Sequence, residues 1–471
     1  MKKYLTVSIL LLVILVFTCI VYAGDKTAVR FPETGAGKRT EAYFNAFNSN
    51  NENDMQTYLE QNITPGNLKE RPIEQRIVIY RQLKSDLSTL EPVKILKEST
   101  YAIKLVARSA KDSWLELTFE FEKSVPYKLL GIRIMRLDEP PDLSAPTTPM
   151  TETEMLKELN AFMNGISVKD EFSGVVLLAK GEEPIFRKAY GLASKEYNIP
   201  NRVDTRFNLG SINKFLTRIA IEQLEGKGAL RLNDPISKYL PDYPNKEAAE
   251  KVTISHLLDM TSGIGDFFGE KYQSTPKDRI RNLSDYLLLF GDKPLLFELG
   301  TNRQYSNGGY IVLGLIIEKV SGQTYFDYVR DHIYKIAGMG NTTHLEADLP
   351  VENVASGYTN NWDENDHPGE PRRNNIYTRP ARGSSAGGGY STVDDLLKLV
   401  VALRGNKLSA PRASEEISRQ GIAIAGGAPG INAEVDTNPE TNYTIIVLSN
   451  YDPPAAAKVA RKINSYLERL K

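Results

Sequence analysis

Apolar and polar side chains alternate strictly along residues 113–123, and this period of two predicts a β-strand with one solvent-facing side. The apolar positions are Leu115, Leu117, Phe119 and Phe121. The surrounding pattern predicts two helices and then four strands, at residues 39–61, 72–87, 93–97, 101–108, 113–123 and 128–137. Helices followed by an antiparallel meander indicate an α+β unit over about residues 36–137.

The rest of the chain, residues 151–471, predicts a second and larger unit. Its opening helix is amphipathic, with apolar side chains at Met155, Leu156, Leu159, Phe162 and Met163. A hairpin of strands 172–180 and 184–190 is expected next, and the chain closes with an apolar strand, 443–448, and a helix, 455–470. Strands at both ends with helices between them predict an α+β fold, in which one antiparallel sheet carries a helical insert.

Two further segments lie outside these units. The stretch 138–150 contains prolines at positions 140, 141, 146 and 149, which hold a chain extended and mark a linker between domains. At the start, Lys2 and Lys3 precede an apolar run that ends at Ala23. This order is typical of a secretory signal peptide, residues 1–23, and predicts an extracytoplasmic protein, periplasmic or secreted. The alternative is an uncleaved membrane anchor, since about 18 apolar residues just span a bilayer.

The composition excludes several classes of protein. The 58 Lys plus Arg and 59 Asp plus Glu give a formal net charge of −1, which provides no attraction to nucleic acid. The single cysteine, Cys19, excludes a disulfide framework and a cysteine-built zinc site. The histidines, at positions 256, 332, 344 and 367, show no paired metal spacing. We therefore expect no metal and no cofactor, and the chemistry must come from ordinary side chains.

The first candidate for that chemistry is Ser211-Ile-Asn-Lys214. Apolar residues follow it at helical spacing, so Ser211 is expected at a helix start with Lys214 one turn later on the same face. A helix N-terminus favours developing negative charge, and a desolvated lysine can be neutral enough to take the serine proton. The alternative is a capping serine near a solvated lysine, and a second copy of the pattern occurs at residues 274–277.

The second candidate is Tyr305-Ser-Asn307. It precedes a helix that is apolar on nearly every face, residues 310–317, so the loop leading into that helix is expected deep in the domain. A phenol near a lysine ammonium can have a lowered pKa and act as a base, and an asparagine amide can orient its neighbours. The alternative is a turn with a packed tyrosine.

Two glycine-rich segments complete the set. In the first, residues 385–395, the glycines allow close backbone approach, and Ser391 or Thr392 can cap the helix that follows. The second runs from Gly426 to Gly430, where backbone donors could line an oxyanion site.

In this order, and together with Leu257-Leu-Asp-Met-Thr-Ser-Gly263, these segments resemble the serine β-lactamase and penicillin-binding-protein superfamily. The likeness is greatest to its class C-related branch of carboxypeptidases, esterases and hydrolases, and it covers most of residues 151–471. It implies a β-lactamase/transpeptidase-like antiparallel sheet flanked by helices, with the site between an all-helical part and an α/β part.

The resemblance also implies a role for each residue of the site. Ser211 would be the nucleophile and Lys214 its base. Tyr305 would be the partner in proton transfer, and Asn307 would be the positioning amide. The oxyanion hole would combine the backbone N–H of Ser211 with one from the Gly426 strand, that of Gly427.

Two departures from the family pattern stand near this strand. The family's third motif normally places a Lys or His on the strand facing the serine, and alignment on Gly426 puts Ile424 there, which carries no charge. A substrate carboxylate therefore loses a partner. The segment 404–420 also looks short, and it shows no sign of the aromatic-glycine strand that the family has at this place.

Two functions remain open on the sequence. The first is an extracytoplasmic serine hydrolase that forms an acyl-enzyme at Ser211 from an ester, a peptide-type amide or a β-lactam. The second is a catalytically impaired homologue that binds cell-wall or peptide ligands, which Ile424 favours. Residues 36–137 resemble the NTF2-like fold in element order alone, and their expected role is that of a packing or ligand-docking module.

Overall fold

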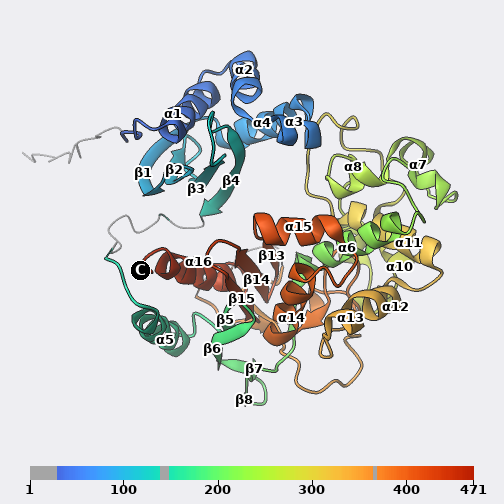
Figure 1. Cartoon of the computed structure of the whole chain (residues 1–471). Helices are drawn as coiled ribbons and strands as arrows, with labels where there is room; N and C mark the ends of the chain where they lie inside the picture. Colours follow the sequence, from blue (N-terminus) through green and yellow to red (C-terminus); the bar gives the residue numbers. More distant parts are fainter. Residues whose placement is uncertain (1–28, 138–139, 141–147, 364–366, 368, 471) are drawn as a thin grey trace, which may run out of the picture. The chain divides into compact units, whose positions relative to one another are not determined.

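The computed structural model describes residues 29–137, 140, 148–363, 367 and 369–470 (Figure 1). The described residues divide into two compact units, 29–73 with 84–137 and 74–83 with 148–470. The predicted signal peptide and Cys19 lie outside the described residues, as does most of the predicted linker. Within the described ranges, no helix is long and apolar enough to cross a membrane.

The first unit contains the predicted helices followed by the predicted meander. Its elements are α1 (Gly35–Asn48), α2 (Glu52–Asn62), α3 (Pro65–Glu70), β1 (Leu90–Glu98), β2 (Ala102–Ser109), β3 (Trp114–Phe121), β4 (Leu129–Leu137) and the two ends of α4 (Ile73–Leu87), whose middle part, Glu74–Leu83, is grouped with the second unit. The strands form an antiparallel sheet in the order β1-β2-β3-β4. All four alternating apolar residues of β3 are buried, which confirms the predicted period.

The single helix predicted over residues 39–61 was wrong. The structure has two helices there, because Asn50 adopts a left-handed backbone conformation (φ 60°) and Asn51 starts a new helix. The Asn51 side chain accepts a hydrogen bond from the backbone N–H of Asn53, as an N-cap does.

The second unit is built around one antiparallel sheet in the order β13-β14-β15-β5-β6. Its strands are β5 (Gly174–Lys180), β6 (Glu183–Tyr190), β13 (Ala423–Ala428), β14 (Ile431–Asn438) and β15 (Tyr443–Ser449). β15 pairs directly with β5, so strands from the two ends of the unit lie side by side (Figure 1). This arrangement confirms the predicted sheet and places the glycine-rich strand β13 at its edge.

Helices cover both faces of this sheet, and β5 is therefore buried on both sides. One face packs against α5 (Glu152–Val168) and α16 (Ala455–Leu467) through residues such as Val176, Leu178 and Val447. The opposite face, with Val175 and Leu177, packs against the helical insert. The amphipathic pattern predicted for the opening helix of this unit thus matches the observed packing of α5.

The insert between β6 and β13 holds the remaining elements. Its helices are α6 (Asn213–Gly226), α7 (Lys246–Lys251), α8 (Ile254–Leu258), α9 (Glu270–Ser274), α10 (Leu283–Phe290), α11 (Asn307–Ser321), α12 (Tyr325–Val329), α13 (Lys335–Ala337), α14 (Val393–Arg404) and α15 (Pro411–Arg419). Its short strands are β7 (Leu192–Ser194), β8 (Ile199–Pro200), β9 (Phe207–Asn208), β10 (Tyr358–Thr359), β11 (Arg373–Asn374) and β12 (Tyr390–Ser391).

The sequence did not indicate α15, which occupies the segment that looked short. Its signal is present in retrospect: Pro411 stands at the first helical position, and Ala413 and Ile417, one turn apart, are both buried. No strand lies between α14 and β13, all of whose intervening residues are described, so the expected absence of the aromatic-glycine strand is confirmed.

Candidate active site

Ser211 lies on one turn of 3-10 helix, Gly210–Ile212, that leads directly into α6. Gly210 before it has a left-handed backbone conformation (φ 50°). A Cβ at this position would lie 2.9 Å from the backbone nitrogen of Gly427, so only glycine lets β13 approach so closely. The predicted helix start is confirmed, and the serine stands between α6 and the sheet edge.

Lys214 follows on the first turn of α6 and reaches back to Ser211. Its Nζ lies 3.1 Å from the Ser211 Oγ, and it also donates to the Asn307 Oδ1 at 2.6 Å and to the Ala386 carbonyl at 2.7 Å. All three acceptors are neutral oxygens, and the lysine is only 6% exposed. The first candidate is therefore a contacting pair and not a capping serine beside a solvated lysine.

This environment changes the protonation of Lys214. Desolvation lowers the pKa of the ammonium to about 7, with the carboxylate of Asp266 acting in the opposite direction. A lysine with that pKa is neutral in a large fraction of molecules at neutral pH. It can therefore accept a proton from a serine hydroxyl, as an ordinary solvated lysine cannot.

Tyr305 contacts the same serine from the loop before α11. Its Oη donates a hydrogen bond to the Ser211 Oγ at 2.6 Å, and the Lys214 Nζ lies 4.6 Å from the centre of its ring. Desolvation raises the pKa of Tyr305 even though 52% of the residue is exposed, and Asp266 acts in the same direction. The hypothesis of a phenol with a lowered pKa was wrong, because desolvation of Tyr305 outweighs the hydrogen bond to Ser211 that acts to lower the pKa.

Asn307 begins α11 and links Lys214 to Asp266, a residue that the sequence did not indicate. Its amide oxygen accepts from Lys214, and its Nδ2 donates to the Asp266 Oδ2 at 2.6 Å. The loop around it is fixed by Ser306, which caps α11 and donates to the Gly265 carbonyl at 3.0 Å. The Tyr-x-Asn segment is therefore part of the site and not an isolated turn.

The glycine-rich loop before β12 closes another side of the site. Its Ala386 carbonyl accepts from Lys214, and Gly388 N donates to the Gly210 carbonyl at 3.3 Å. Beyond the loop, the Thr392 side chain caps α14, accepting from the Asp395 N–H. Both expectations for this segment, close backbone approach and a helix cap, are confirmed.

The strand β13 supplies the wall opposite the lysine. Gly426 is buried there, with the backbone of Leu209 and Ser211 next to its Cα, and Gly427 N lies beside Gly210. Residues two apart share a face of a strand, so Ile424 lies on the same face as Gly426, where it packs against the core of the helical insert. The strand therefore presents backbone donors and an apolar side chain to this region, with no cation.

The second Ser-x-x-Lys copy does not form such a site. The Ser274 hydroxyl donates to the backbone carbonyls of Glu270 and Lys271, and the Lys277 Nζ donates to backbone carbonyls of its own loop.

Among the described residues no cluster of histidine, cysteine and carboxylate side chains could hold a metal ion.

A family model described as Beta-lactamase matches residues 159–468 of the chain. The chain belongs to this family. It is thus a member of the serine hydrolase superfamily that includes penicillin-binding proteins, esterases, amidases and β-lactamases. The match does not reach the first unit, for which the NTF2-like resemblance stays a prediction.

Individual relatives agree with this assignment. The putative penicillin-binding protein PbpX of Bacillus subtilis (strain 168) is 31% identical over 264 residues, covering 55% of this chain and 63% of that protein. Esterase EstB of Burkholderia gladioli is 28% identical over 288 residues, covering 54% of this chain and 70% of EstB. The chain therefore spans less than two-thirds of PbpX and somewhat more of EstB.

Solved structures show the same fold. The crystal structure of a penicillin-binding protein from Bacillus halodurans matches with a TM-score of 0.57 and 31% identity, over 64% of this chain and 98% of that one. A class C β-lactamase matches with a TM-score of 0.53 over 67% of this chain and 97% of that one. At 20% identity, this second likeness shows the fold alone.

Proposed function

We propose that this protein is a serine hydrolase that works through an acyl-enzyme at Ser211. The observation that carries the proposal is the position of the Ser211 Oγ, 3.1 Å from the Lys214 Nζ and 2.6 Å from the Tyr305 Oη. Both distances are within hydrogen-bond reach, so a base, Lys214, and a proton donor, Tyr305, both contact the nucleophile.

In the proposed reaction, neutral Lys214 accepts the hydroxyl proton while the Ser211 Oγ bonds to the substrate carbonyl carbon. The carbonyl oxygen becomes an oxyanion, which the backbone N–H groups of Ser211 and Gly427 stabilise. Tyr305, a neutral phenol, passes a proton to the leaving group and recovers one from Lys214. The bond to the leaving group breaks and leaves the acyl group on Ser211.

Deacylation repeats these steps with water as the nucleophile. Water loses a proton to the Lys214–Tyr305 pair as its oxygen bonds to the acyl carbon, and Ser211 leaves with a proton returned through the same pair. The Asn307 amide keeps the lysine amine aimed at the serine throughout, since its oxygen lies 2.6 Å from the Nζ.

Ile424 favours a substrate without a carboxylate next to the scissile bond. It is apolar and lies on the face of β13 that contains Gly426, so this strand brings no positive charge to the serine. A carboxylate moved out of water without a partner is costly. Neutral esters are thus the proposed substrates, ahead of peptide-type amides and β-lactams that bear a carboxylate.

The absence of a cation at Ile424 also supports the second candidate, an impaired homologue that binds cell-wall or peptide ligands. The two candidates separate in one assay. The protein and its Ser211→Ala variant are compared on small aryl esters, a D-alanyl-D-alanine peptide and a chromogenic β-lactam. Serine-dependent turnover of the esters supports the hydrolase. Ligand binding without turnover of any of the three supports the impaired homologue and overturns the hydrolase.

We also propose an extracytoplasmic location for the protein. The location is supported by Lys2, Lys3 and the apolar run that ends at Ala23. Mass spectrometry of protein secreted by an expressing bacterium tests the location, because cleavage gives a new N-terminus at Gly24. Retention of residues 1–23 in the membrane fraction would contradict cleavage.

A further inference from the structure

We propose that Asp266 is a positioning residue of this site, one that holds the Asn307 amide with its oxygen toward Lys214 and keeps a negative charge beside that lysine. The inference rests on the proposed function and deepens it. Asp266 acts through Asn307 and Lys214, since its recorded contacts are with the Asn307 amide and with the backbone of its own loop.

The orientation of Asn307 depends on this contact. A side-chain amide has one oxygen, which accepts, and one nitrogen, which donates, and the two ends are similar in shape. Asp266 is an acceptor, so it selects the Nδ2 end at 2.6 Å, and the Oδ1 end is left to accept from Lys214 at 2.6 Å. With the amide reversed, an NH2 group would face the lysine amine and a carbonyl oxygen would face a carboxylate.

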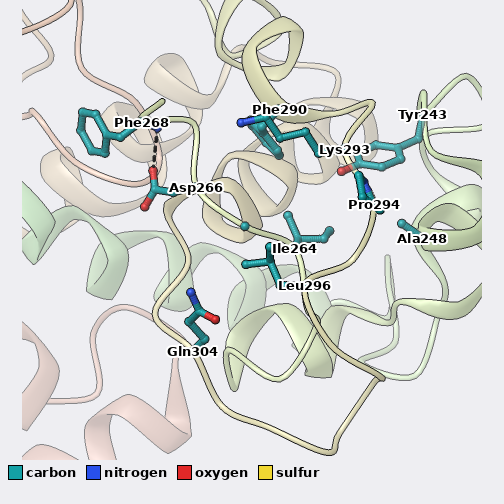
Figure 2. Close-up of a pocket in the computed structure, with 11 residues that line it drawn as sticks. Tyr243, Ala248, Ile264, Asp266, Phe268, Phe290, Lys293, Pro294, Leu296 and Gln304 are labelled. Atoms are coloured by element: carbon teal, nitrogen blue, oxygen red, sulfur yellow. Dashed lines mark hydrogen bonds between the residues drawn. The ribbon is translucent and has the colours of Figure 1, made fainter. Parts of the chain in front are cut away.

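Asp266 is itself held in place. Its Oδ1 accepts from the backbone N–H of Phe268 at 3.0 Å, the bond drawn in Figure 2, while its Oδ2 accepts from the Asn307 Nδ2. Asp266 also lines a cavity of about 270 Å³ whose wall combines apolar side chains, such as Phe290, with the polar side chains of Lys293 and Gln304. The two hydrogen bonds fix the carboxylate, and its charge acts on Lys214 from this position.

The groups that face Lys214 come from several elements. Tyr305 and Tyr310 present their rings, with centres 4.6 and 5.7 Å from the Nζ, and Asp266 is the carboxylate whose charge acts on the lysine. Arg218, Asp259 and Arg303 act on Tyr310 instead. Removal of the Asp266 charge therefore has a defined sign: it destabilises the ammonium and favours the neutral amine.

The test compares Asp266→Asn with Asp266→Ala, and with Asp292→Asn as a charge-matched control on an exposed loop. Asp266→Asn keeps the shape and removes the charge, so the acid limb of kcat/KM moves about one unit to lower pH. Asp266→Ala also frees the Asn307 amide, and kcat falls by about a hundredfold through misplacement of the lysine. The control keeps the wild-type rate and pH profile.

A second measurement is independent of turnover. Lysine labelled with ¹³C at Cε is incorporated, the Lys214 signal is assigned with Lys214→Met, and its titration is followed by NMR. A lower midpoint in Asp266→Asn than in the wild-type protein supports the inference, and equal midpoints overturn it. If the wild-type protein has no Ser211-dependent activity, the proposed hydrolase fails, and this titration still decides the role of Asp266.

Discussion

No side chain fits between Gly426 and Leu209. A Cβ on Gly426 would lie 1.9 Å from the carbonyl oxygen of Leu209 and 2.9 Å from the backbone nitrogen of Ser211. Atoms cannot approach so closely, so β13 lies against the nucleophile only because residue 426 is glycine. The position of the proposed oxyanion donor, the N–H of Gly427, depends on this packing.

The variant Gly426→Ala tests that dependence. The added methyl group pushes β13 away from Ser211, and a displacement of about 1 Å in a catalytic group costs about a hundredfold in rate. We expect kcat/KM for an aryl ester to fall by about that factor, with the circular dichroism spectrum retained. Gly226→Ala is the matched control, because a Cβ there meets nothing within 4 Å. A Gly426→Ala protein with wild-type kcat/KM would contradict the packing argument.

The pKa of Lys214, lowered to about 7 by burial, predicts the pH dependence of activity. The base must be neutral, so kcat/KM rises about tenfold per pH unit below 7 and levels off above it. Steady-state kinetics between pH 5 and 9 measure this limb. Activity that keeps rising up to pH 9, as expected for a lysine with an ordinary pKa, would show that burial does not act on this group.

Tyr305→Phe separates the roles of the two residues that contact Ser211. The change removes the Oη 2.6 Å from the serine, and the loss of an acid–base group costs about 10² to 10⁴ in rate. We expect kcat to fall within that range while the acid limb stays near pH 7, because Lys214 still titrates. Disappearance of the limb in Tyr305→Phe would instead identify the tyrosine as the titrating base.

Ile424→Lys tests why carboxylate-bearing substrates are disfavoured. A lysine ammonium on this face of β13 provides the missing partner, and a charged hydrogen bond contributes enough to raise acylation by about tenfold or more. Stopped-flow acylation by a penicillin is the measurement, with neutral Ile424→Met as the control for side-chain shape. An equal rate in the Lys and Met variants would show that the charge at residue 424 does not limit the reaction.

Local patterns predicted the parts of the site that lie close together in the sequence. Ser211 and Lys214 are three residues apart at a helix start, so helical spacing predicts that they lie on the same face. The sheet was also predictable, because β5 and β15 are strongly apolar runs bounded by polar turns. The positions of Tyr305 and Asn307 followed from the family resemblance.

Contacts made by tertiary packing could not be predicted in the same way. Asp266 and Asn307 are 41 residues apart. The local sequence around Asp266 gives no sign that its carboxylate contacts the Asn307 amide. The direction of the Tyr305 pKa shift was missed for a related reason, since it depends on how far Tyr305 is desolvated. Burial is a property of the assembled domain.

The central claim is that Ser211 is the acylated nucleophile, and covalent labelling tests it most directly. The protein is incubated with a fluorophosphonate, digested, and analysed by peptide mass spectrometry, with Ser211→Ala and Ser274→Ala treated in parallel. We predict one adduct, on Ser211, that forms in Ser274→Ala at the wild-type rate and is absent from Ser211→Ala. Labelling of Ser211→Ala at the wild-type rate, or no adduct on Ser211 in the wild-type protein, would contradict the account.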